Sequence, residues 1–248
     1  MTARVAPPSQ PYAGAVAVTA VLVHGLWYGG WSWDAVRAAL GRRGIESSAP
    51  DLPMRSLDGD AAVVTAVLDS LDGPAVLVGH SYGGAVITAA GAHPGVRALV
   101  YVAAFALAQG ESISRVAPET PIPATGLAAA LRFSDDGSEV RLDPVTGRAV
   151  LYNATPEPVA AAALARTRPV ARALFSARPA TVAWRERRAV YAICARDACV
   201  APDLQRLMAA RLDEQVTWDS DHSAPAGHPD LVADLVAREV GRVADSDG

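Results

Sequence analysis

Short apolar runs alternate with stretches of helical periodicity along most of the chain, and this alternation restricts the fold more than any other feature. Strands are expected at residues 15–23, 45–49, 74–78, 96–103, 189–194 and 215–218. Helices are expected at residues 33–43, 85–92, 202–211 and 229–243, and a further one, capped by Asp58 or Asp60, is expected to end at Leu71. Strands that are apolar throughout are typical of parallel sheets buried on both faces. The pattern therefore predicts an α/β fold with a mostly parallel, doubly wound sheet.

The alternation stops between about residues 105 and 187, where prolines cluster and the charged turn Asp135-Asp136-Gly137 occurs. We interpret residues 105–187 as a cap, or lid, inserted between two core strands. The core then comprises residues 15–104 and 188–248, and residues 1–14 form a flexible N-terminal arm. Within the cap, we expect a helix at 157–164 and a small hairpin that pairs 140–142 with 149–151 around a turn at 144–147.

The composition excludes several classes of function. The net charge of -4 gives no basic footprint for nucleic acid, and the absence of lysine excludes Schiff-base chemistry. The two cysteines, Cys194 and Cys199, are too few for a disulfide framework and lack the spacing of a zinc site, so we expect both to be buried. No signal peptide or membrane span is evident. We expect a cytoplasmic protein without cofactor, metal, membrane or nucleic-acid partner, for which a homodimer is an open alternative.

A G-x-S-x-G motif, Gly79-His80-Ser81-Tyr82-Gly83, lies between an expected strand and an expected helix. Five residues alone are a weak signal, but this context is the one a nucleophile elbow requires. The sharp turn needs glycines, and it exposes the serine hydroxyl at the start of a helix whose dipole favours negative charge. The motif predicts that Ser81 is a nucleophile; the alternative is an ordinary serine in a strand–helix turn.

The base that activates such a serine should follow a late strand, since elbow enzymes have the chain order serine, acid, histidine. Of the five histidines, only His222 and His228 meet this condition. His222 lies in a loop, whereas His228 directly precedes Pro229 and is typical of a helix entry. We therefore predict His222 as the base, and we expect His24 to hold its loop by a side-chain hydrogen bond.

The acid that orients the base is predicted to be Asp197, three residues beyond an expected strand at the carboxyl edge of the sheet. Asp203 is the main alternative, but it is better explained as a charge in the first turn of a helix. Asp219 and Asp221 flank the predicted base closely, and we interpret them as solvated loop acids.

An oxyanion hole needs two backbone N–H donors that face the attacked carbonyl. Tyr82, which follows the nucleophile, is expected to supply one, and Leu26 in the loop after the first strand the other. Gly25 lets that loop come close. Trp27 and Tyr28 lie at the expected mouth of the site, where they either shape a substrate pocket or pack against the sheet.

These motifs resemble a known family. Residues 21–33 are similar to the H-G-x-x-x-G-x-W-x-W opening of the plant methyl-ester esterases, the hydroxynitrile lyases and their bacterial relatives. The similarity continues through residues 78–84, 191–197 and 202–205 and ends in Asp221-His222, the pair that carries the base in this family. The resemblance implies an α/β-hydrolase fold. The lyases have threonine where Gly25 stands and lysine directly after the histidine, where this chain has Ser223, so the resemblance favours an esterase.

The predicted function is hydrolysis of a small to medium hydrophobic carboxylic ester, such as a methyl ester or a lactone, through an acyl-enzyme on Ser81. Two alternatives remain open at this point. One is a non-hydrolytic enzyme on the same scaffold, such as a lyase, cyclase or dehydratase. The other is a ligand-binding protein that has lost turnover.

Overall fold

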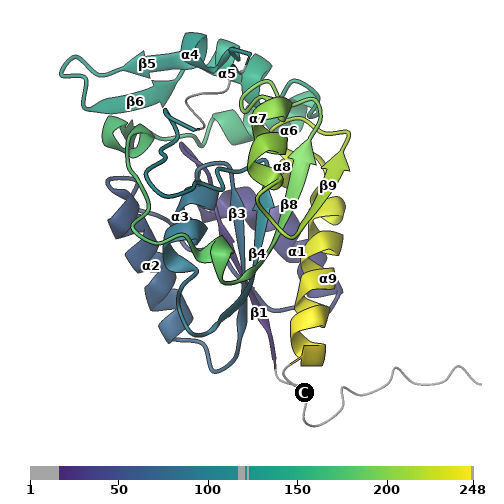
Figure 1. The fold of residues 1–248 in the computed structure, drawn as a ribbon. Helices are drawn as coiled ribbons and strands as arrows, with labels where there is room; N and C mark the ends of the chain where they lie inside the picture. The colour runs from purple at the N-terminus through teal and green to yellow at the C-terminus, as the bar shows by residue number, and fades with distance from the viewer. Residues whose placement is uncertain (1–16, 117–120, 122, 247–248) are drawn as a thin grey trace, which may run out of the picture.

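The computed structural model describes residues 17–116, 121 and 123–246 (Figure 1). Its central sheet contains β1 (Thr19–Val23), β2 (Ser47–Ser48), β3 (Ala75–His80), β4 (Val96–Val102), β8 (Arg188–Cys194) and β9 (Glu214–Trp218). The strand order is β2-β1-β3-β4-β8-β9, and every neighbouring pair is parallel. The predicted parallel sheet is confirmed. The first two residues of the predicted first strand and the predicted N-terminal arm lie outside the described residues.

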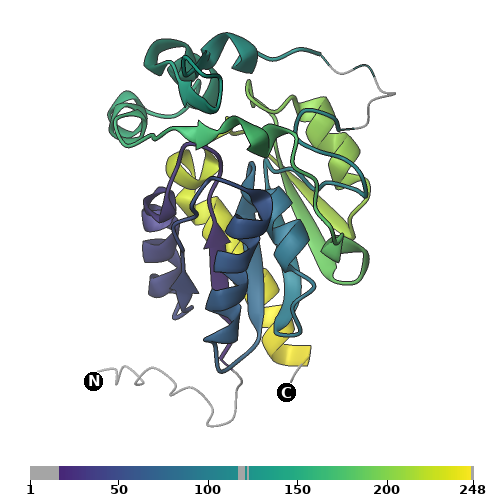
Figure 2. The ribbon, with the colours of Figure 1, turned by 90° about the vertical axis from the view of Figure 1, so that its left-hand side faces the viewer.

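Helices cover both faces of this sheet, as predicted (Figures 1 and 2). One face carries α1 (Asp34–Arg42) and α9 (Pro229–Ser246); the other carries α2 (Leu57–Asp69), α3 (Gly83–Ala90) and α7 (Pro202–Ala209). Successive strand residues point to opposite faces. In β1, Leu22 packs in the core beneath α1 and α9, while Val21 packs in the core beneath α2 and α3. None of the described helices is long and apolar enough to cross a lipid bilayer.

The cap of α2 differs from the prediction. Ser56 caps the helix, since its hydroxyl accepts the Gly59 N–H at 3.1 Å. Asp60 is instead buried and accepts the Met54 N–H at 2.8 Å and the Tyr82 hydroxyl at 2.6 Å. A serine at the N-cap satisfies a free helix N–H without burying a charge, whereas the buried Asp60 ties α2 to the turn at the end of β3.

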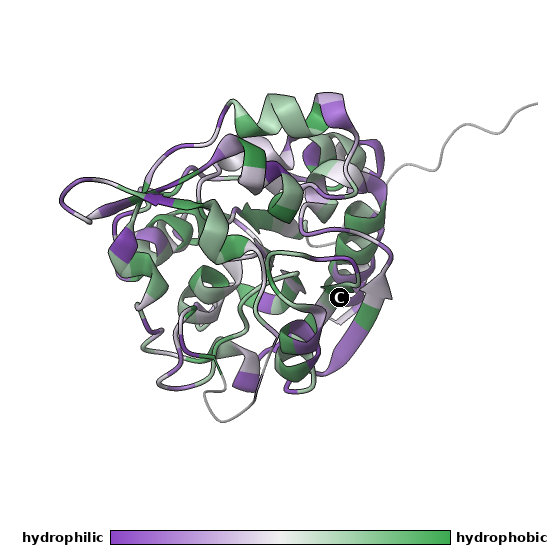
Figure 3. Cartoon of the chain, turned by 90° about the horizontal axis from the view of Figure 1, so that it is seen from above, coloured by the Kyte–Doolittle hydropathy of each residue, from purple (hydrophilic) through white to green (hydrophobic). Residues whose placement is uncertain are grey.

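Residues 105–187 are hereafter called the β4–β8 segment. Most of its described part lies across the upper end of the sheet, and its last part runs down beside α3 to the start of β8 (Figures 1 and 2). The segment contains α4 (Leu127–Ala130), β5 (Leu131–Phe133), β6 (Glu139–Leu142), α5 (Pro144–Leu151), α6 (Glu157–Leu164), β7 (Val170–Ala171) and the 3-10 helices η2 (Arg172–Phe175) and η3 (Ala183–Arg185). Strands β5, β6 and β7 form a small antiparallel sheet. The β5–β6 hairpin projects at the left when the molecule is seen from above (Figure 3).

The predicted helix at 157–164 is confirmed, but the predicted hairpin is wrong. Residues 144–151 form α5, and β6 pairs with β5 and β7 instead. Two local signals favour the helix: Pro144 occupies its first turn, and Asp143 caps it by accepting the Thr146 N–H at 2.9 Å.

Candidate active site

Ser81 lies in a strained turn directly after β3. Its φ of 54° is left-handed, a conformation that non-glycine residues adopt rarely and mostly at functional sites. The carbonyl oxygen of Ser81 accepts N–H groups from Gly84 and Phe105, each at 3.0 Å, which fixes the turn against the residues after β4. The helix α3 begins two residues later, at Gly83. The predicted strand–turn–helix context of the motif is therefore present.

Two glycines allow the loop after β1 to pack on this turn. A Cβ at Gly25 would lie 2.9 Å from the Cβ of Ser81, so a side chain there would push the loop away from the serine. A Cβ at Gly83 would collide with the carbonyl oxygen of Val23. The backbone of residues 24–26 therefore lies directly beside Ser81, as an oxyanion-binding loop requires.

The two predicted oxyanion donors are both close to Ser81, one in the chain and the other in space. Tyr82 follows Ser81, and Leu26 follows the glycine that contacts it. Both residues are buried, and in the described part of the chain neither backbone N–H donates to a protein acceptor. Buried N–H groups are rarely left unpaired. These two N–H groups are therefore exceptions that the predicted oxyanion role would explain.

His222 and Asp197 form a buried pair. The Nδ1 of His222 lies 2.7 Å from Oδ2 of Asp197. The same oxygen accepts the Gln205 side-chain amide at 2.8 Å, while Oδ1 accepts the N–H groups of Cys199 and Val200 at 2.7 and 2.8 Å. Four donors thus fix the orientation of the carboxylate. This role of Gln205 was not predicted from the sequence. The position of Gln205, in the first two turns of the helix that follows the acid, could have indicated it.

This pairing sets the tautomer of His222. Nδ1–H donates to the carboxylate, which leaves Nε2 as the basic nitrogen. Burial by itself lowers the pKa of His222, but the charge and hydrogen bond of Asp197, together with the neighbouring Cys199, raise that pKa well above its ordinary value. A base with a raised pKa accepts a proton more readily, as a serine hydroxyl requires.

Two other histidines support the site without serving as bases. His80 donates from Nε2 to the His222 carbonyl at 2.8 Å, and its ring lies 4.8 Å from that of His222. Burial lowers the pKa of His80 well below its ordinary value, so it is neutral. His24 bonds the Gly25 carbonyl at 2.9 Å and accepts the Leu52 N–H at 3.1 Å, which confirms the loop-holding role predicted for it. Burial lowers the pKa of His24 to about 4.

The alternatives to the predicted pair lie elsewhere. The side chain of Asp203 is 65% exposed and pairs with Arg206 in the first turn of α7. The side chain of Asp219 is 83% exposed and pairs with Arg196. His228 ends α8 (Ala224–Gly227) and directly precedes α9.

Asp221 does not match its prediction as a solvated loop acid: it is only 1% exposed. Its Oδ1 accepts the Ser223 N–H at 3.0 Å. Its Oδ2 accepts the Ala154 N–H at 2.8 Å, and the Thr155 N–H and hydroxyl at 2.7 and 2.9 Å. The prediction failed because the donors come from the β4–β8 segment. Asp221 ties this segment to the loop that carries His222.

The oxyanion loop is tied to the same segment. The Trp27 indole N–H donates to the Val140 carbonyl at 3.2 Å, and the Arg168 N–H donates to the Trp27 carbonyl at 3.0 Å. Tyr28 is buried, and its ring stacks on His80 with centroids 5.9 Å apart. Of the two residues expected at the mouth of the site, Tyr28 therefore packs against the active-site core. Trp27 extends toward Phe175 of the segment, with ring centroids 6.2 Å apart.

A mostly apolar cavity of about 370 Å³ adjoins these residues. On the core side it is lined by Phe105, whose N–H holds the Ser81 turn, and by Cys199 and Val200, whose N–H groups hold Asp197. On the other side it is lined by the β4–β8 segment, including Leu127, Leu131 and Phe175. Cys194 and Cys199 are free thiols, and both are buried as predicted. The cavity therefore lies between the β4–β8 segment and the residues that hold the Ser81 turn and Asp197.

Comparison with known proteins agrees with this geometry. Residues 20–235 match the alpha/beta hydrolase family. The alpha/beta hydrolase nvfD of Aspergillus novofumigatus (strain IBT 16806) is 31% identical over 213 residues, which cover 79% of this chain and 82% of that protein. A carbendazim hydrolyzing esterase of Nocardioides sp. (strain SG-4G) is 34% identical over 117 residues, which cover 42% of this chain and 48% of the esterase. This chain thus spans about half the length of that esterase.

Solved structures show the same fold at low sequence identity. A pyrethroid hydrolase from Sphingobium faniae JZ-2 superposes with a TM-score of 0.80 and 24% identity, covering 92% of this chain and 99% of that one. A methylesterase from Arabidopsis gives 0.72 and 22%, covering 90% and 99%. The predicted α/β-hydrolase fold is confirmed, and because the family match spans most of the chain, this protein belongs to the alpha/beta hydrolase family.

Proposed function

We propose that this protein is a serine esterase that cleaves a carboxylic ester through an acyl-enzyme on Ser81. The observation that carries the proposal is the buried Asp197–His222 pair, which is bonded at the His222 carbonyl by His80, the residue directly before Ser81 and its left-handed turn. A serine hydroxyl is a poor nucleophile until a base removes its proton, and the base must be held in one tautomer. The named esterases among the relatives support the same reaction class.

In the proposed mechanism, the hydroxyl oxygen of Ser81 attacks the ester carbonyl while Nε2 of His222 accepts the proton. Asp197 stabilises the imidazolium that forms. The N–H groups of Leu26 and Tyr82 bind the oxyanion, a contribution that is typically about 3–4 kcal/mol per donor. His222 then protonates the leaving alcohol. Water, deprotonated by His222, cleaves the acyl-enzyme and regenerates Ser81.

The proposed substrate is a small to medium hydrophobic ester, such as a methyl ester or a lactone. The apolar lining of the 370 Å³ cavity supports this class. We further propose that the β4–β8 segment acts as a cap that shapes this cavity, with core boundaries near residues 105 and 187, and that the protein acts in the cytoplasm.

The test is hydrolysis of short p-nitrophenyl esters by the wild type and by paired variants. Ser81→Ala and His222→Ala should lose about 10³-fold or more in kcat, and Asp197→Asn about 10²-fold or more. The two rival positions provide matched controls, since His228→Ala and Asp203→Asn should stay within about threefold. A fluorophosphonate should label the wild type once, on Ser81, and fail to label Ser81→Ala.

Equal rates in the wild type and Ser81→Ala would refute the nucleophile assignment. Loss of activity in His228→Ala but not in His222→Ala would refute the choice of base. Labelling of Ser81 by the fluorophosphonate without turnover of any ester would move the function toward non-hydrolytic chemistry at the same triad.

A further inference from the structure

A second, outer hollow of about 700 Å³ lies next to the cavity beside the proposed catalytic centre. The outer hollow is formed entirely by the β4–β8 segment, including Phe133, Gly137, Ser138 and Arg172. Three residues line both spaces: Ser114, Leu131 and Phe175. The two hollows are therefore adjacent, with these three residues as a shared wall between them.

The shared wall is apolar and is anchored to the oxyanion loop. Phe175 contacts the ring of Trp27, which follows the proposed oxyanion donor Leu26. Beyond the wall, Phe133 keeps 54% of its surface exposed. The shared wall and Phe133 thus offer aromatic and aliphatic surface to an apolar chain or ring.

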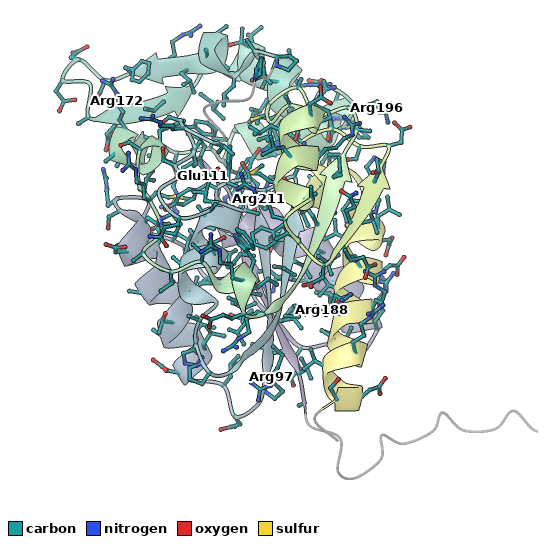
Figure 4. The ribbon with its side chains drawn as sticks, viewed as in Figure 1. Arg97, Glu111, Arg172, Arg188, Arg196 and Arg211 are labelled. Carbon is teal, nitrogen blue, oxygen red and sulfur yellow. The ribbon has the colours of Figure 1, made fainter. Side chains whose placement is uncertain are left out.

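Arg172 is the one charged residue that lines the outer hollow. Its backbone N–H donates to the Ser138 carbonyl at 2.8 Å, which fixes its position, and its guanidinium lies 5.3 Å above the Phe133 ring. Arg172 is the first residue of η2 and lies next to the β5–β6 hairpin, at the upper left of Figure 4. A guanidinium held over an aromatic ring at the rim of an apolar hollow is suited to receive an anion.

The acids nearest to Arg172 are engaged elsewhere. Glu139 on β6 pairs with Arg55 at 2.6 Å. Asp136 in the β5–β6 turn accepts the hydroxyls of Ser134 and Ser138 at 2.6 and 2.8 Å. Among the residues that the structure describes, no carboxylate lies within ion-pair distance of Arg172. Its charge is therefore available to a ligand.

We propose that the enzyme takes elongated esters whose remote end carries a carboxylate, and that Arg172 binds this carboxylate. The apolar middle of such a ligand lies along Leu131 and Phe175, with the ester group at Ser81. The inference rests on the proposed esterase function for the chemistry at the ester, but the binding of the remote carboxylate does not depend on turnover.

The test measures binding to Ser81→Ala, so that hydrolysis does not interfere. Two ligand series are compared at matched chain lengths: monomethyl esters of linear dicarboxylic acids, and methyl esters of the corresponding monocarboxylic acids. At the lengths that span both hollows, the acid-tailed ester should bind about three- to tenfold more tightly at low salt, as expected for a partly exposed charge-assisted contact. The preference should fall as the ionic strength rises.

The same comparison in two double variants assigns the effect. Adding Arg172→Met keeps an apolar stem and should abolish the preference for the acid tail, while the neutral ester binds as before. Adding Arg178→Met, an exposed arginine in the same segment that lines neither hollow, should leave the preference intact.

Equal binding of the two esters at every chain length would overturn the inference, as would a preference that survives Arg172→Met or disappears with Arg178→Met. Turnover of short neutral esters by the wild type is measured in parallel and tests the esterase proposal separately. An acid-tail preference without turnover would support the Arg172 site and refute the esterase function. Turnover without the preference would support the esterase function and refute the Arg172 site.

Discussion

The carboxylate of Asp221 is the buried group whose removal has the most predictable consequences. It accepts four hydrogen bonds, one from Ser223 on the catalytic loop and three from Ala154 and Thr155 in the β4–β8 segment. Asp221→Ala removes all four acceptor contacts at a site that is 1% exposed. Asp221→Asn keeps the shape of the side chain but replaces one oxygen with a donor.

The two variants should differ in stability by a calculable amount. Each buried donor that loses its acceptor costs about 1–3 kcal/mol, although a hydroxyl can rotate toward a new partner. We therefore expect Asp221→Ala to lower the free energy of unfolding by about 3–6 kcal/mol. In Asp221→Asn, the remaining oxygen can face Ala154 and Thr155, which leaves the Ser223 N–H opposite an NH₂ group. One unpaired donor and the lost charge predict a decrease of about 1–3 kcal/mol.

Activity should fall as well, because Asp221 directly precedes the proposed base. A displacement of a catalytic group by about 1 Å can reduce the rate by about 10²-fold. We expect kcat of Asp221→Asn to fall by about tenfold or more under conditions in which the variant is fully folded. Urea unfolding gives the stability change, and p-nitrophenyl ester hydrolysis gives kcat. Asp219→Asn, two residues earlier and 83% exposed at its side chain, is the matched control and should change stability by less than about 0.5 kcal/mol.

Two results would refute this reasoning. If Asp221→Ala and Asp219→Asn were equally stable, the four contacts would contribute nothing net. If Asp221→Asn lost stability but its folded form kept the wild-type kcat, the tie would be structural and would not position His222.

Three further predictions follow from the site. Gln205→Ala should lower the free energy of unfolding by about 1–3 kcal/mol in urea titrations, and kcat with it, because Asp197 loses one of its four donors. The acidic limb of the kcat/KM profile should lie above the range of an ordinary histidine, because the proposed mechanism requires neutral His222, whose pKa is raised. Asp197→Asn should shift that limb to lower pH. Gly83→Ala should impair folding and activity, because its Cβ would collide with a carbonyl at the end of β1. The control is Gly41→Ala on α1, where space is open; it should raise the free energy of unfolding by about 0.5–1 kcal/mol in the same titrations.

The features that could be predicted from the sequence are those encoded locally. The strands of the parallel sheet have continuous apolar runs, and the turn at Ser81 has its own motif between a strand and a helix. Chain order narrowed the base to two histidines and favoured His222, and the structure pairs that residue with Asp197. Each of these inferences needed only neighbouring residues or the order of elements along the chain.

The features that were missed depend on contacts between distant residues. The local sequence around Asp221 is typical of a solvated loop acid. In the structure, however, the segment around Thr155, 66 residues earlier, covers it. Strand β6 was recognised, but its partners were not, because Leu131–Phe133 is too short for a periodic signal. Small antiparallel sheets are specified by cross-strand contacts more than by intrinsic propensity, so local patterns do not determine their pairing.

The same distant contacts connect substrate choice to catalysis. The β4–β8 segment lines the cavity and the outer hollow, and it also holds the oxyanion loop through Val140 and Arg168 and the loop of the base through Thr155. A substitution that enlarges the cavity from this segment therefore shifts groups that stabilise the transition state as well as groups that bind the ground state. Changes in the segment should alter kcat together with KM, whereas a cap hinged away from the catalytic loops would alter KM alone. Under the proposed mechanism, we therefore expect the substrate range to be limited by how far Val140, Thr155 and Arg168 can move before the oxyanion loop and His222 lose their positions.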